Sequence, residues 1–250
     1  MISYFLLYVK YLISQFKVFK DEVRKLLNNG LVKFDWNFAE KYSNEEISYF
    51  LHLEGKSIEA ISIIRNLQKS EVQKHIIACK IKYRYVVKSQ NIEELFKTLS
   101  KVGKSERIYI LNSLDVVNKT KLIDYILKNH LEVSLKEKEF GIWVLGELRA
   151  SQSVDFLIKS TVHKFVNIRR LSVSALGKIG DSKGEMALLR ALQDENNQVV
   201  SYAIKSLQKI KSEKAIEKIE EIYKVNDRPY IKKACEEFLN SFKDTKDSIG

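Results

Sequence analysis

The chain has 250 residues, 45% of them hydrophobic and 30% charged, a balance that excludes a disordered protein and one embedded wholly in a membrane. A single proline and nine glycines in this length favour helices joined by short turns over a protein of many strands. The formal net charge of +11 makes nucleic acid, anionic lipid and acidic protein surfaces candidate partners.

The first 43 residues differ in composition from the rest of the chain. Residues 2–19 are dense in aromatic and aliphatic side chains, and no Lys or Arg precedes them, so a signal peptide is not expected. Lys10, near the middle of this run, would cost about 2.5–3.5 kcal/mol at the centre of a membrane. We therefore predict a hydrophobic helix with three alternative roles: it caps the folded domain or docks a partner, it lies on a membrane surface, or it spans the membrane. Residues 31–43 would link this helix to the domain.

A 31-residue repeat follows this segment and extends over residues 44–242. Positions 31 apart hold the same kind of side chain in several columns, which is typical of stacked structural repeats. One column is Leu114, Leu145, Leu176, Leu207 and Phe238. A second column, mostly of small residues, is Cys79, Ile110, Gly141, Ser172, Ala203 and Ala234. A third column is Ile64, Leu95, Ile126, Leu157, Leu188 and Ile219.

Each repeat contains two helical patterns. In the first, Ser172 and Leu176 lie four residues apart on one face, where a neighbouring helix can approach closely. In the second, residues 154–161 carry the spacing of a helix with one apolar face. Capping boxes that begin helices are predicted at Ser43 with Glu46, Ser70 with Gln73, and Ser182 with Glu185, and Pro229 fits the first turn of the last helix. A lone helical pair cannot bury its apolar face, so the pairs must stack, and a polar tail follows over residues 243–250.

The stretch "IRRLSVSALGKIGDSKGEMALLRALQDENNQVVSYAIKSL" resembles the HEAT-like repeats of bilin lyases and of many bacterial scaffold proteins. The matching residues are Arg169, Leu176, Gly177, Ile179, Gly180, Asp181, Leu188, Leu192, Asp194, Val199, Ala203 and Leu207. The resemblance covers roughly residues 134–240, is weaker over 44–133 and is absent from 1–35. It implies an all-α fold, which we expect to be a right-handed α-solenoid of about six 31-residue HEAT-like helix pairs behind the N-terminal hydrophobic helix.

No set of residues indicates catalysis, a metal or a cofactor. HEAT-type deoxyhypusine hydroxylases hold two irons with His-Glu pairs, and none of the four histidines here precedes a glutamate. Cys79 and Cys235 have no neighbouring cysteine, so a disulfide framework and a cysteine zinc site are not expected. Alkylpurine DNA glycosylases, which are similar to this chain in size and charge, use aromatic residues and an aspartate. Trp143 and Glu147 lie four apart and could imitate that arrangement, whereas the repeat columns predict that Trp143 packs in the core.

The repeat also predicts a column of positive charge. Lys97, Lys128, Lys159 and Arg190 are spaced by 31 residues, two positions after the aliphatic column of the second helix. We call these four residues the basic ladder. In HEAT-like solenoids the second helices line the concave side, and stacked helices about 8–10 Å apart could place this ladder along a phosphate backbone or an acidic partner. The alternative is a solvated face in a protein rich in lysine.

From these observations we expect a non-enzymatic interaction scaffold in the cytoplasm, peripheral to the membrane if residues 2–19 bind one. It would hold a protein or peptide partner, for instance an acidic one, in the concave groove of the solenoid. The alternative is a nucleic-acid-binding protein that resembles the HEAT-like glycosylases and uses the basic ladder. Nucleic-acid binding would show a steep salt dependence, because bound phosphates release counterions.

Overall fold

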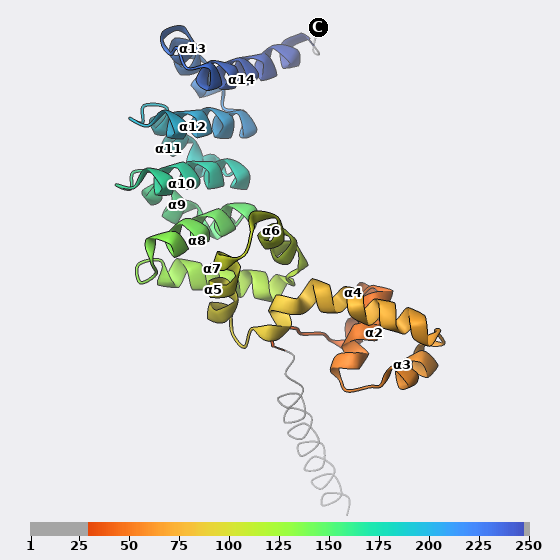
Figure 1. Cartoon of the computed structure of the whole chain (residues 1–250). Coiled ribbons are helices and arrows are strands. Elements are labelled where there is room, and N and C mark those ends of the chain that lie inside the picture. The colour runs from red at the N-terminus through yellow and green to blue at the C-terminus, as the bar shows by residue number, and fades with distance from the viewer. Residues whose placement is uncertain (1–29, 248–250) are drawn as a thin grey trace, which may run out of the picture. The chain divides into compact units, whose positions relative to one another are not determined.

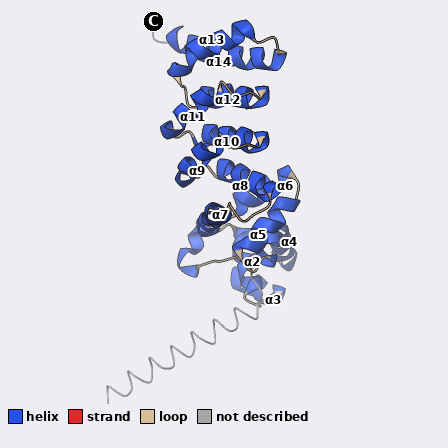
Figure 2. Cartoon of the chain, turned by 90° about the vertical axis from the view of Figure 1, so that its left-hand side faces the viewer, coloured by secondary structure: helices blue, strands red, loops and turns tan. Residues whose placement is uncertain are grey.

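The structure is a computed structural model that describes the backbone of residues 30–247 and the side-chain surroundings of residues 30–242. The hydrophobic helix predicted over residues 2–19 lies outside the described residues. Every regular element in the described part of the chain is a helix, which confirms the all-α prediction (Figure 2). The chain divides into two compact units, one ending at Asn118 and the other beginning at Lys119.

Unit 1, which ends at Asn118, contains short helices around one longer helix. Its elements are η1 (Trp36–Lys41), α2 (Asn44–Leu53), α3 (Ile58–Arg65), α4 (Lys69–Lys88), α5 (Ile92–Lys101), α6 (Lys104–Ser113) and the start of α7 (Val116–Asn129). Helices α2 and α3 both pack on α4, around the buried side chains of Phe50, Ile61 and Val72. The buried hydroxyl of Ser48 on α2 also contacts Arg65 of α3 at 2.7 Å and His75 of α4 at 3.1 Å. The three helices therefore share both an apolar core and a polar link.

Unit 2, from Lys119 onward, is a stack of helix pairs (Figure 1). Its elements after α7 are α8 (Leu135–Glu147), η2 (Ser151–Ser153), α9 (Val154–Ser160), α10 (Val166–Ile179), η3 (Ser182–Gly184), α11 (Glu185–Ala191), α12 (Asn197–Lys209), η4 (Glu213–Ala215), α13 (Ile216–Val225) and α14 (Pro229–Asp247). The first helices of the pairs, α8, α10, α12 and α14, pack on one another in chain order. The short second helices α9, α11 and α13 pack against the first helix of the following pair. Unit 2 thus has a continuous layer of first helices.

The 31-residue columns predict this alternation well. Leu157 of α9 and Leu188 of α11 are both fully buried at equivalent positions, as the repeat requires. The small-residue column, from Cys79 to Ala234, lies on α4, α6, α8, α10, α12 and α14 and is buried throughout. In the aliphatic column that contains Leu157 and Leu188, Ile64 of α3 is an exception, because it is 58% exposed. Ile64 is the first member of its column, and Ile61, three residues earlier, supplies the buried contact of α3 instead.

Two of the three predicted capping boxes are wrong. Ser43 and Glu46 do form the box that begins α2. However, α4 begins one residue before Ser70, with Gln68 at the N-cap, and Ser182 lies inside η3, whose cap is Asp181. Helix α14 begins at Pro229, as predicted, and extends to Asp247, so it includes the first residues of the predicted polar tail.

Candidate functional site

The part of the basic ladder that belongs to unit 2 is exposed on successive second helices. Lys128, Lys159 and Arg190 lie at the ends of α7, α9 and α11, and none of them makes an ion pair with a described residue. Each lies in the last turn of its helix, where the helix dipole favours a positive charge by about 0.3–1 kcal/mol. The regular spacing of the ladder therefore has a structural cause even without a ligand.

The first member of the ladder differs from the other three. Lys97 belongs to unit 1, lies in the middle of α5, and forms an ion pair of 2.6 Å with Glu93. Both side chains are about half exposed, so this pair contributes little to stability. Three of the four predicted ladder residues therefore belong to unit 2, and Lys97 belongs to unit 1.

Trp143 is half-buried on α8 and stacks on Phe140, with ring centroids 5.9 Å apart. Glu147, one turn further on, accepts a hydrogen bond of 2.6 Å from Lys178 of α10. The carboxylate that could imitate a glycosylase site beside Trp143 is thus held by a lysine of the next repeat. Trp143 remains a candidate surface residue, because its ring is not enclosed in the core.

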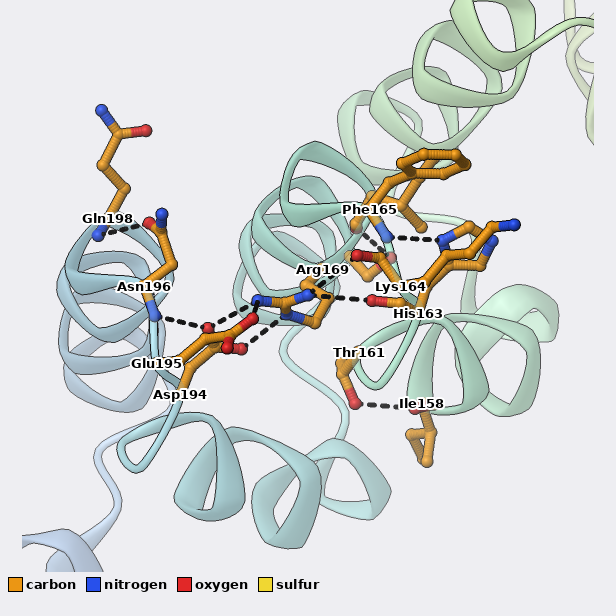
Figure 3. Close-up of polar contacts among 12 residues, drawn as sticks. Ile158, Thr161, His163, Lys164, Phe165, Arg169, Asp194, Glu195, Asn196 and Gln198 are labelled. Carbon is orange, nitrogen blue, oxygen red and sulfur yellow. Dashed lines mark hydrogen bonds and ion pairs between the residues drawn. The ribbon is translucent and has the colours of Figure 1, made fainter.

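A dense set of polar contacts surrounds Arg169 between α10 and the loop before α12 (Figure 3). The guanidinium group donates to both carboxylate oxygens of Asp194, at 2.7 and 2.9 Å, and to Glu195 at 3.0 Å. It also donates to the carbonyl oxygens of His163 and Lys164. Both Arg169 and Asp194 are only 9% exposed, and the neighbouring carboxylate raises the pKa of the guanidinium group. These contacts hold two successive inter-helix loops together, so we assign Arg169 a structural role.

Helices α3 and α4 of unit 1 are joined by a tight turn. Ser57 caps the start of α3, and Asn66 ends α3 in the left-handed conformation, with φ 51° and ψ 49°. Asparagine tolerates this conformation better than most residues. Only Leu67 and Gln68 then separate Asn66 from the first residue of α4. A short helix, a turn of about three residues and a second helix that packs against the first form a helix-turn-helix arrangement.

The exposed face at the start of α4 carries mainly polar and charged side chains. Helix α4 contains six Lys or Arg residues and one glutamate. In its first three turns the exposed residues are Lys69, Ser70, Glu71, Gln73, Lys74, Ile77 and Ala78. Ser70, Gln73 and Lys74 make no side-chain hydrogen bond or ion pair with any described residue, and Lys69 is held only by an exposed ion pair with Glu59 at 3.3 Å. This face can therefore offer donors and acceptors to a ligand.

An open cleft of about 390 Å³ lies on the other half of α4, bounded by η1, α2 and α6 of unit 1. Its lining includes Glu46, Lys82 and Tyr83. Burial alone would raise the pKa of Glu46, but hydrogen bonds from Lys82, Tyr83 and the Ser43 backbone outweigh it and lower that pKa. Burial, together with the bond to Glu46, raises the pKa of Tyr83. The charged Glu46 side chain thus connects α2 to α4 through hydrogen bonds from Lys82 and Tyr83.

Burial shifts the pKa of both cysteines and of two histidines. Burial raises the pKa of Cys79 and of Cys235 to about 11, so both thiols are protonated at neutral pH and are weak nucleophiles. Burial lowers the pKa of His52 and of His163, which favours the neutral form of both imidazoles. Within residues 30–242, no three His, Cys, Asp or Glu side chains are grouped as metal ligands require. None of the described helices is both long and apolar enough to cross a membrane.

Comparison with known families separates the two parts of the chain. Residues 154–240 match the family model for HEAT repeats, so unit 2 contains HEAT-like repeats, as the sequence resemblance predicted. Residues 44–131 match a model described as a helix-turn-helix domain. A comparison with curated proteins found no match to the chain.

Sequence reasoning missed the α3–α4 segment as a candidate site. The signal was present in "GKSIEAISIIRNLQKSEV", in which a capping serine precedes a short apolar helix and an asparagine-containing turn precedes the next helix. The 31-residue columns obscured it, because Ile64 and Cys79 fall in register with those columns.

Proposed function

We propose that the chain is a non-enzymatic interaction scaffold that binds double-stranded DNA with the start of α4 and a protein partner with its HEAT-like repeats. The observation that carries the DNA-binding part is the tight turn at Asn66 followed by the exposed, polar start of α4. In helix-turn-helix proteins the second helix enters the major groove and its first residues contact base edges.

The side chains at the start of α4 suit this role. Lys69 and Lys74 can neutralise phosphates or donate to guanine, and Gln73 can form paired hydrogen bonds with adenine. The major groove of B-form DNA is about 12 Å wide and admits a helix, whereas the major groove of A-form RNA is too narrow for side chains to read. We therefore assign duplex DNA, rather than duplex RNA, as the ligand of α4.

The protein-binding part rests on the HEAT-like repeats, a framework that stacks helices into an extended surface. The basic ladder is the competing site for nucleic acid, because Lys128, Lys159 and Arg190 are exposed without an ion pair to a described residue. Since their positions are also explained by the helix dipole, α4 is the stronger candidate for DNA.

The test measures duplex DNA binding by fluorescence anisotropy at several salt concentrations. Lys69→Gln combined with Lys74→Gln should weaken binding and reduce the slope of log K against log salt by about 0.9 for each phosphate that the variant no longer neutralises. The matched control changes Lys128, Lys159 and Arg190 to Gln, and it should leave the slope unchanged. If the parent chain binds no duplex, or if only the control variant weakens binding, the assignment of DNA to α4 is wrong.

A further inference from the structure

The first-helix layer of unit 2 carries a strip of apolar side chains, some of which are partly exposed. Phe140, Leu171 and Tyr202 lie at 31-residue intervals and occupy the same position on α8, α10 and α12. Trp143, three residues after Phe140, widens the strip at one end. Phe140 is buried and stacks on Trp143. Trp143 and Leu171 are half-buried, and Tyr202 is 37% exposed. Because α8 packs on α10 and α10 packs on α12, these side chains form a row across three neighbouring helices.

Positive charges border this strip. The guanidinium group of Arg170 lies 5.2 Å from the ring centroid of Tyr202, and Lys205 is exposed one turn beyond Tyr202 on the same helix. Neither Arg170 nor Lys205 forms an ion pair with a described residue. Glu139, at the position equivalent to Arg170 one repeat earlier, is the acidic side chain at the Trp143 end. The strip is therefore apolar along its length and positively charged over α10 and α12.

We propose that this first-helix strip of unit 2, rather than the basic ladder on the second helices, is where the scaffold binds its protein partner, and that the partner is an acidic peptide segment with regularly spaced apolar residues. The inference rests on the protein-binding part of the proposed function. Apolar side chains of the peptide would cover Trp143, Leu171 and Tyr202, and its carboxylates would pair with Arg170 and Lys205.

The geometry also sets the spacing of the peptide's apolar residues. Packed helices lie about 8–10 Å apart, and a peptide in the polyproline II conformation advances about 3.1 Å per residue with three residues per turn, so every third side chain points to the same side. Three peptide residues therefore span the distance from one first helix to the next. A polyproline II segment with an apolar residue at every third position and acidic residues between them fits the row.

The experiment uses the full chain and a synthetic peptide that repeats Leu-Asp-Glu. Trp36→Phe removes the other tryptophan, so that the remaining fluorescence reports on Trp143 alone. We expect saturable binding that changes Trp143 emission and weakens as salt is added. Tyr202→Ser and Arg170→Gln should each lower the affinity at least about tenfold. Met186→Ser, which removes a 61% exposed apolar side chain of α11, is the matched control and should leave the affinity unchanged.

Three results would overturn the proposal: no saturable binding, equal binding of a peptide that repeats Ser-Asp-Glu, or an equal drop in affinity in the Met186→Ser variant. Circular dichroism melting of each variant separates weaker peptide binding from a failure to fold. Duplex DNA binding by the Tyr202→Ser variant is expected to equal that of the parent. Failure of the peptide to bind therefore leaves the DNA assignment of α4 intact, and failure of DNA to bind leaves the peptide site intact.

Discussion

Gly177 of α10 lies so close to α12 that it has no room for a side chain. A Cβ atom there would lie 2.3 Å from Ser206 Oγ and 2.7 Å from Ser206 Cα. Because backbone cannot move aside as a flexible side chain can, Gly177→Ala should lower the free energy of unfolding by about 1–3 kcal/mol. Urea denaturation measures the change. Gly103→Ser is the control, since nothing lies within 4 Å of a Cβ at that position. Unchanged stability of Gly177→Ala would contradict the close packing of first helices.

The aliphatic column of the second helices predicts which leucines support unit 2. Leu157 and Leu188 are fully buried at equivalent positions, so replacing either by Ala should cost about 2–5 kcal/mol of unfolding free energy. Lys159→Ala, at an exposed position of the same helix as Leu157, should change it little. Chemical denaturation of the three variants checks this. Two leucine variants as stable as the parent would show that the 31-residue register is wrong.

At the scale of elements, the turn between α3 and α4 depends on one backbone conformation. Asn66 has φ 51°, which glycine adopts freely and which a β-branched residue strongly disfavours. Asn66→Gly should therefore preserve both stability and DNA affinity, whereas Asn66→Val should cost about 1–3 kcal/mol and weaken DNA binding. Thermal melting and anisotropy measure the two effects. Equal behaviour of the two variants would argue against a helix-turn-helix geometry at this turn.

The link between α2 and α4 makes unit 1 sensitive to acid. Glu46 is 14% exposed and its pKa is lowered in the fold, so its contribution to stability is present above the usual glutamate pKa of about 4.3. That contribution is lost as the pH falls through the lower pKa of the folded state. Glu46→Gln should therefore flatten the decline of unfolding free energy below about pH 4.3. Glu220→Gln, at an exposed position of α13, is the control, and an identical pH profile in both variants would contradict this role of Glu46.

The repeat columns predicted α8 to α14 well, because in HEAT-like repeats the same positions are buried in every copy. Leu157, Leu188 and Ile219 are all fully buried. The columns could not predict that Ile64 would be exposed, since a column records the type of side chain and not whether a neighbouring repeat is there to cover it. The columns also could not predict whether the Trp143 side chain would be fully or only half buried, because aromatic residues suit both positions.

At the scale of the whole molecule, two parts of the chain match different family models. The match to a helix-turn-helix domain covers residues 44–131, and the match to HEAT repeats covers residues 154–240. In the proposed function, a net charge of +11 would attract the whole chain to DNA, and the exposed polar groups of α4 would provide the local contacts. A scaffold of this kind would bring a protein partner to a DNA site without catalysing a reaction itself.

Hydrogen exchange of the full chain with and without duplex DNA tests whether α4 binds DNA, because it locates the bound surface without a mutation. With DNA bound, we expect slower exchange at residues 66–78, which comprise the Asn66 turn and the first turns of α4. We expect no change at the ends of α9 and α11, which carry Lys159 and Arg190. Protection confined to the ends of α9 and α11, or no protection at residues 66–78 when DNA is bound, would contradict the assignment of DNA to α4.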